Sequence, residues 1–104
     1  MIISQNYLEK IISVDKAISL YTHIPIDIMH SEDRRSHVVY AKFISWYILH
    51  EKFAIPYKVI GYAYNNKDHG TIMNGVDRVN SNMEWKTKAD KIYITEVNNR
   101  RQYH

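Results

Sequence analysis

Glycine is confined to one short part of this chain, between residues 60 and 79. Glycine weakens a helix interior, so glycines gathered together indicate a close contact or a special backbone conformation. The same segment holds Asn65 and Asn66, and asparagine tolerates a left-handed backbone better than other non-glycine residues. We therefore expect one helix to about Tyr64, a tight turn, and a second helix beginning near Asp68, which is a helix-turn-helix. The three glycines are Gly61, Gly70 and Gly75.

The length of 104 residues predicts one domain over 1–104, because such a chain buries a single modest core. A hydrophobic content of 45% is ordinary for a globular protein. There is no cysteine, which excludes a disulfide framework and a cysteine-based zinc site. The start lacks the features of a signal peptide, and the longest apolar run, 43–49, is too short for a membrane span. We expect a cytoplasmic, nucleoid-associated protein with no membrane partner.

Positive charge is concentrated in the second part of the chain. Residues 1–33 hold two basic and five acidic side chains, a net charge of −3, whereas residues 34–104 hold twelve basic and six acidic ones, a net charge of +6. The basic part begins at Arg34 and Arg35 and includes the glycine segment. This asymmetry suits an anionic partner of the second part of the chain. On the evidence of charge alone, a solvated surface of mixed charge is an equally good explanation.

Apolar side chains recur at helical spacing along most of the chain, which predicts an all-α bundle of five to six helices. The charged segment 31–36 is expected to be a loop. Trp85 and Ile92 anchor a last helix over about 87–98, although residues 93–97 suit a strand equally well, and 98–104 is expected to fray. The other helices are expected over about residues 4–21, 25–29, 37–52, 56–64 and 69–82.

Two of these helices carry specific expectations about their faces. Phe43, Trp46 and Tyr47 are expected to be core anchors of the helix over 37–52. In the helix over 69–82, Asp68 is expected to cap the start by accepting from the N–H of Thr71. The core face of this helix is expected to hold Ile72, Gly75, Val76 and Val79, and its outer face His69, Gly70, Met73, Asn74 and Asp77.

The helix-turn-helix segment resembles the C-terminal DNA-binding domain of the bacterial replication initiator DnaA. The family pattern reads Ile-Gly, two variable residues, Phe, Gly-Gly and Arg-Asp-His-Thr-Thr-Val. Here Ile60 and Gly61 begin the match and the segment 67–72 completes it, with Tyr64 at the phenylalanine and the two asparagines at the double glycine. The resemblance covers about residues 15–80, leaving 84–104 as a C-terminal extension. The ATPase region of the family has no counterpart in these residues, so ATP-driven origin melting is not implied.

The resemblance implies sequence-specific binding of double-stranded DNA, in replication or transcription control. A short chain without an ATPase region suits a regulator or replication accessory, for which a phage or mobile element is one expected origin. The helix over 69–82 would enter the major groove, and the loop bearing Arg34 and Arg35 would enter the adjacent minor groove. Helix N-termini favour phosphate, and residues in a first turn reach base edges. The expected DNA-binding residues are Arg34, Arg35, Lys42, Lys58, Lys67, Asp68, His69, Gly70, Thr71 and Asn74.

Two departures from the family pattern bear on the DNA target. Gly70 stands where the family has a threonine that reads a base, so one contact is lost. Glu32 and Asp33 lie beside Arg34 and are expected to weaken its attraction to phosphate. We therefore expect a changed sequence preference, or low affinity supplemented by a second subunit.

An alternative from another class is a protein-interaction module that docks a replication protein or self-associates through exposed tyrosines and tryptophans. An enzyme is disfavoured because the sequence shows no zinc motif, phosphate-binding glycine loop or nucleophile elbow. Asp68 and His69 are helix neighbours that do not face each other, so they make a poor catalytic pair. No cofactor, metal or nucleotide is expected.

Overall fold

The first helix, α1, begins and ends where the sequence provides caps. The computed structural model describes residues 2–98. The Ser4 hydroxyl accepts from the N–H of Tyr7 at 3.2 Å, and His23 ends α1 in the left-handed region at φ 61°.

The described residues form six α-helices and two π-helical segments, which confirms the all-α class. They are α1 (Gln5–Thr22), α2 (Ile26–Met29), α3 (Ser36–Tyr47), η1 (Ile48–Lys52), α4 (Tyr57–Ala63), α5 (His69–Asn80), α6 (Met83–Ile92) and η2 (Tyr93–Asn98).

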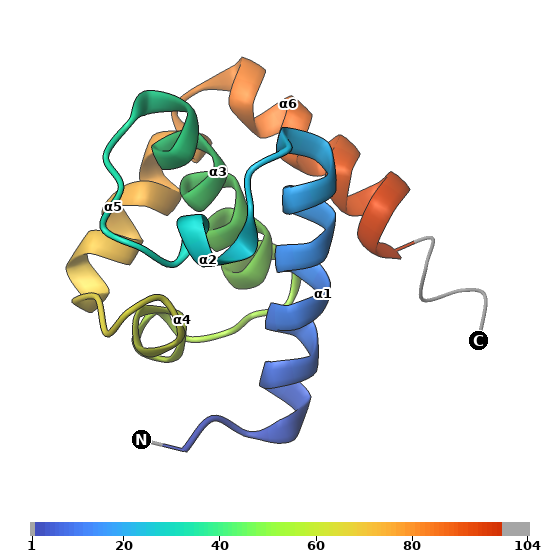
Figure 1. Cartoon of the computed structure of the whole chain (residues 1–104). Coiled ribbons are helices and arrows are strands. Elements are labelled where there is room, and N and C mark those ends of the chain that lie inside the picture. Colours follow the sequence, from blue (N-terminus) through green and yellow to red (C-terminus); the bar gives the residue numbers. More distant parts are fainter. Residues whose placement is uncertain (1, 99–104) are drawn as a thin grey trace.

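Helix α3 lies at the centre of the molecule, with α1 along one side and α5 along the other (Figure 1). Its aromatic side chains are core anchors, as expected: Trp46 and Tyr47 are buried and Phe43 is partly buried. The expected helix over 37–52 is helical throughout, but it widens into the π-helical η1 at Ile48.

Helix α5 comes close to α3 because Gly75 has no side chain. A Cβ atom at Gly75 would lie 2.6 Å from Cε3 of Trp46 and 2.8 Å from Cδ1 of Phe43, well inside normal contact distance. Gly75 therefore allows close helix packing, which is one of the close contacts that the clustered glycines indicate. The predicted core face of α5 is also confirmed, because Ile72, Gly75, Val76 and Val79 are all buried.

The C-terminal part of the described chain differs from expectation. Helix α6 begins at Met83, four residues earlier than predicted, because the Asn82 side chain caps it by accepting from the N–H of Trp85 at 3.1 Å. Residues 93–97 form π-helical turns in η2, so the strand alternative is wrong. The expected fraying falls mostly on residues 99–104, which lie outside the described residues.

Polar contacts attach α6 to the end of α3 and to η1. The Tyr47 hydroxyl donates to Oδ1 of Asp90 at 2.8 Å, and Nζ of Lys52 lies 3.1 Å from the same oxygen. Ile92 and Val97 are buried in the common core. The described part of the C-terminal extension thus contributes to the core. Among the described residues, no helix is both long and apolar enough to cross a membrane.

Candidate nucleic-acid interface

Helices α4 and α5 are joined by a tight turn whose backbone explains two features of the sequence. Asn65 and Asn66 adopt left-handed conformations at φ 62° and 56°, as expected. The N–H of Lys67 then donates to the carbonyl of Gly61 at 2.7 Å. A Cβ atom at Gly61 would overlap the Lys67 carbonyl oxygen, so this glycine makes room for the backbone of the turn. The close contact that the clustered glycines indicate is thus made at Gly61 with the backbone of the turn.

The start of α5 is capped by Asp68, although its partner differs from the one expected. Oδ2 of Asp68 accepts from the N–H of Gly70 at 3.0 Å, whereas the N–H of Thr71 bonds the backbone carbonyl of Asp68. The expected bond from the Thr71 N–H to the side chain is therefore wrong. A side chain two residues before its donor makes a tighter turn than the three-residue cap, and both arrangements satisfy free N–H groups of a first helical turn.

The outer face of α5 is open to solvent at its N-terminal end. The side chain of His69 is 67% exposed, and Thr71 and Asn74 are also exposed. Nδ1 of His69 lies 3.9 Å from Oδ1 of Asp68, too far for a hydrogen bond. The imidazole and the Thr71 hydroxyl are thus available to an external partner.

The two arginines of the basic loop have different environments. Nη2 of Arg35 lies 2.6 Å from Oδ2 of Asp33, and its Nε donates to both carboxylate oxygens. This bidentate pair lowers the pKa of Asp33 to about 2 and raises the pKa of Arg35. Arg34 is exposed and makes no hydrogen bond or ion pair within residues 2–98. Arg34 is therefore the free guanidinium of the loop.

The three lysines expected to contact phosphate also differ from one another. Lys42 is only 5% exposed, and its Nζ donates to the carbonyls of Ser31 and Asp33 at 2.8 and 2.9 Å. Burial lowers its pKa, and its role is to hold the loop, so direct phosphate contact is not supported for Lys42. Lys67 is paired with an acid of the loop, whereas Lys58 is exposed and has no such partner in the described chain.

Two depressions bring most of the expected residues together. One, of about 300 Å³, lies between the basic loop and α5, and its lining includes Arg34, Trp46 and Thr71. The other, of about 430 Å³, lies along the turn and is lined by Lys58, Lys67 and His69 among others. Asn74 lines neither depression and lies further along the outer face of α5.

A buried polar network beneath this surface was not predicted from the sequence. Asp15 of α1 accepts from Nε2 of His30 at 2.8 Å and from the Tyr64 hydroxyl. Nδ1 of His30 lies 2.8 Å from the carbonyl of Ala63, and its ring stacks on Tyr64 with centroids 4.0 Å apart. Both ring nitrogens face acceptors, so the network is complete with a doubly protonated imidazole. It ties the end of α4 to α1.

Two signals in the sequence pointed to this network. Asp15 falls on the apolar face of α1, between Val14 and Ile18, where a carboxylate needs a partner. Tyr64 occupies a position of phenylalanine in the resembling family, and a buried tyrosine hydroxyl seeks a hydrogen-bond partner. Burial lowers the pKa of His30, but the hydrogen bond and the charge of Asp15 outweigh it, so the pKa is raised.

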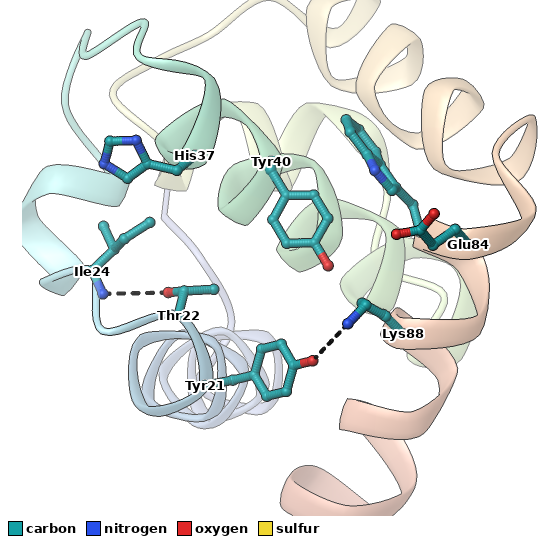
Figure 2. A pocket seen from close by; sticks show the side chains of 8 residues that line it. Tyr21, Thr22, Ile24, His37, Tyr40, Glu84 and Lys88 are labelled. Carbon is teal, nitrogen blue, oxygen red and sulfur yellow. Dashed lines mark hydrogen bonds between the residues drawn. The ribbon is translucent and has the colours of Figure 1, made fainter.

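A further depression of about 330 Å³ lies away from the helix-turn-helix, between α1, α3 and α6 (Figure 2). Tyr21, Tyr40 and Trp85 provide aromatic walls, and Nζ of Lys88 lies 3.5 Å from the Tyr21 hydroxyl. None of the expected DNA-binding residues lines it. Most large aromatic side chains are at least partly buried, and Tyr21 and Tyr62 are the most exposed of those described.

The capped α5, the tight left-handed turn and the outward polar face define a helix-turn-helix domain. A family described as the bacterial dnaA protein helix-turn-helix matches residues 10–79. The chain therefore belongs to the bacterial DnaA helix-turn-helix family, the class of the DnaA C-terminal DNA-binding domain.

Curated relatives support the same family. The chromosomal replication initiator protein DnaA of Acholeplasma laidlawii is 26% identical over 81 residues, which are 78% of this chain and 18% of the relative. The protein of the same name from Enterococcus faecalis (strain ATCC 700802 / V583) is 26% identical over 96 residues, 92% of this chain and 21% of the relative. The chain thus spans about a fifth of the length of these relatives. No solved structure matches it significantly.

Proposed function

We propose that this chain binds double-stranded DNA sequence-specifically, with the start of α5 in the major groove and Arg34 in the adjacent minor groove. The observation that carries the proposal is that Arg34 and Thr71, one from the basic loop and one from α5, line the same depression and are both exposed. A recognition helix reads bases from its N-terminal turn, and a narrow minor groove attracts arginine. The process named by its relatives, chromosomal replication initiation, is the proposed setting. Transcription control and a phage or mobile-element origin stay predictions.

The expected contacts on α5 and beside the turn have separate proposed roles. His69 and Thr71 approach base edges or adjacent phosphates in the major groove, and Asn74 extends this face along α5. Lys58 contacts phosphate beside the turn. Asp68 acts mainly as the cap of α5, because its carboxylate is already engaged by the N–H of Gly70.

The target sequence is proposed to differ from the one that the family usually reads. Gly70 presents no side chain where the family pattern has threonine, so one base position loses a direct contact. The two acidic residues of the basic loop oppose DNA binding less than their charges alone suggest. Asp33 is paired with Arg35 and Glu32 with Lys67, so each negative charge already has a cationic partner.

Binding-site selection from a random duplex pool tests the function directly. The proposal predicts that a consensus sequence emerges and that affinity for it falls steeply as salt rises. If no duplex is retained even at low salt, DNA binding is ruled out. The interaction-module alternative would then be preferred.

Substitution of Arg34 and His69 tests the assigned contacts. Arg34→Ala and His69→Ala should each weaken binding to the selected duplex by about 1–3 kcal/mol, with a smaller effect on a scrambled duplex. Lys16→Ala, an exposed substitution on α1, is the control for loss of a surface charge. Unchanged preference for the selected duplex in both variants would show that other residues read the DNA.

A further inference from the structure

The basic loop is clasped to the turn of the helix-turn-helix by one glutamate. Oε1 of Glu32 accepts from the side-chain amide of Asn65 at 3.0 Å. The two Glu32 oxygens lie 3.2 and 3.1 Å from Nζ of Lys67. We call Glu32, Asn65 and Lys67 the clasp. It joins segments that are 33 and 35 residues apart in the chain.

The clasp completes the fixation of the loop between α2 and α3. Lys42 holds the carbonyls of Ser31 and Asp33 from below, and Asp33 holds Arg35. The clasp adds the lateral contact to the turn before α5. Of the two loop arginines, only Arg34 keeps a free side chain, and the loop backbone that carries it is fixed by these three sets of contacts.

The two charged side chains of the clasp differ in their exposure to solvent. The side chain of Lys67 is only 15% exposed, whereas that of Glu32 is 63% exposed. The hydrogen bond and charge of Lys67 lower the pKa of Glu32, so the carboxylate stays ionised at neutral pH. A negative charge on the DNA-facing surface opposes binding to any duplex. The benefit of Glu32 must therefore lie in geometry.

We propose that Glu32 is a positioning residue for sequence recognition, which sets the reach of Arg34 relative to the start of α5 by holding Asn65 and Lys67. This inference rests on the proposed DNA-binding function. It makes a prediction opposite in sign to simple electrostatics. Loss of the carboxylate removes repulsion from every duplex. It nevertheless lowers the preference for the selected duplex, because Arg34 in the minor groove and α5 in the major groove are no longer held at the spacing that lets both make their contacts at once.

The main test is Glu32→Gln, which keeps the size of the side chain and removes its charge. The ratio of affinities for the selected duplex and for a scrambled duplex of the same composition should fall about tenfold, within the range for losing one base contact. The slope of log affinity against log salt should steepen by about one, because Lys67 becomes free to meet a phosphate. A ratio that stays unchanged while both affinities rise equally would overturn the positioning role.

Two further variants separate the clasp from general charge effects. Lys67→Gln breaks the same contact from the other side and should lower the ratio by a similar factor, and the double variant with Glu32→Gln should fall no further. Glu84→Gln is the matched control, because Glu84 is exposed on α6, across the molecule from α4 (Figure 1). It should leave the ratio unchanged, and an equal fall there would overturn the proposal.

A measurement without DNA keeps this inference distinguishable from the proposed function. Amide hydrogen exchange of residues 31–36 should accelerate in Glu32→Gln and Lys67→Gln, while the melting temperature stays close to that of the parent, since exposed pairs add little stability. Unchanged exchange in the loop would overturn the clasp itself. If exchange accelerates in the two variants but the parent protein selects no duplex, the clasp stands and the result counts against DNA binding alone.

Discussion

Gly75 illustrates how one residue decides the approach of two helices. Trp46 is 1% exposed, and it and Phe43 occupy the space that a Cβ atom at position 75 would need. Buried rings in a close-packed interior cannot move aside without disturbing their own neighbours. Gly70, in the same helix, is less constrained: a Cβ atom there meets only the exposed end of the Asp68 side chain, at 2.9 Å from Oδ2, which can turn aside at the cost of its bond to the N–H of residue 70.

Alanine substitutions at Gly75 and Gly70 should have different effects on the stability of the fold. Gly75→Ala should destabilise the fold by about 1–3 kcal/mol through overpacking, outweighing the gain of up to about 1 kcal/mol in helix propensity. Gly70→Ala should be neutral or slightly stabilising. Urea unfolding of both variants measures the difference. Equal stability of the two variants would contradict the packing role of Gly75.

At the scale of elements, the turn between α4 and α5 depends on backbone conformation at two asparagines. Asn66 is the cleaner of the two to study, because Asn65 also donates to Glu32. The left-handed conformation at φ 56° disfavours residues with a Cβ atom, and asparagine bears it better than alanine does. The turn sets the direction in which α5 leaves α4.

Substitutions at this position should separate backbone strain from side-chain contacts. Asn66→Ala should cost about 1–2 kcal/mol of unfolding free energy, whereas Asn66→Gly should be tolerated, because glycine adopts a positive φ without penalty. Thermal unfolding monitored by circular dichroism gives the comparison. If both variants lose the same stability, the side chain of Asn66 and not its backbone is what matters.

At the scale of the whole molecule, the network of Asp15, His30 and Tyr64 joins three helical regions that are distant in the chain. Because the pKa of His30 is raised above its ordinary 6.5, the folded state holds this proton more tightly than the unfolded state does. The stabilisation is then fully present below about pH 6.5 and is lost as pH rises through the raised pKa. The Tyr64 hydroxyl does not titrate there, since burial and Asp15 raise its pKa well above 10.

The free energy of unfolding should therefore decrease as the pH rises above about 6.5 and through the raised pKa of His30. Urea unfolding over this range measures it. His30→Gln should be less stable at pH 6 and should lose most of the decrease, whereas His23→Gln, an exposed substitution, should retain it. A parent protein whose stability is flat over this range would show that His30 is neutral in the fold.

Much of the architecture followed from local patterns in the sequence. The apolar spacing of α1, the glycine and asparagine pattern of the turn and the small residue at Gly75 each reflect interactions within a few residues or a steric need of one residue. Such constraints act through backbone preferences and helical periodicity, so they can be read in order along the chain. The start of α6 was missed because an asparagine cap at Asn82 is a weaker signal than an apolar stripe.

Local patterns in the sequence were enough to predict the helix-turn-helix, the all-α class and the family motif. Which of the basic residues are free depends instead on the folded arrangement. Lys42 is drawn inside by carbonyls, Arg35 and Lys67 are engaged by acids, and Arg34 and Lys58 remain open. The reason is physical: the environment of a long charged side chain depends on partners from distant segments, and folding alone brings those partners within hydrogen-bonding distance.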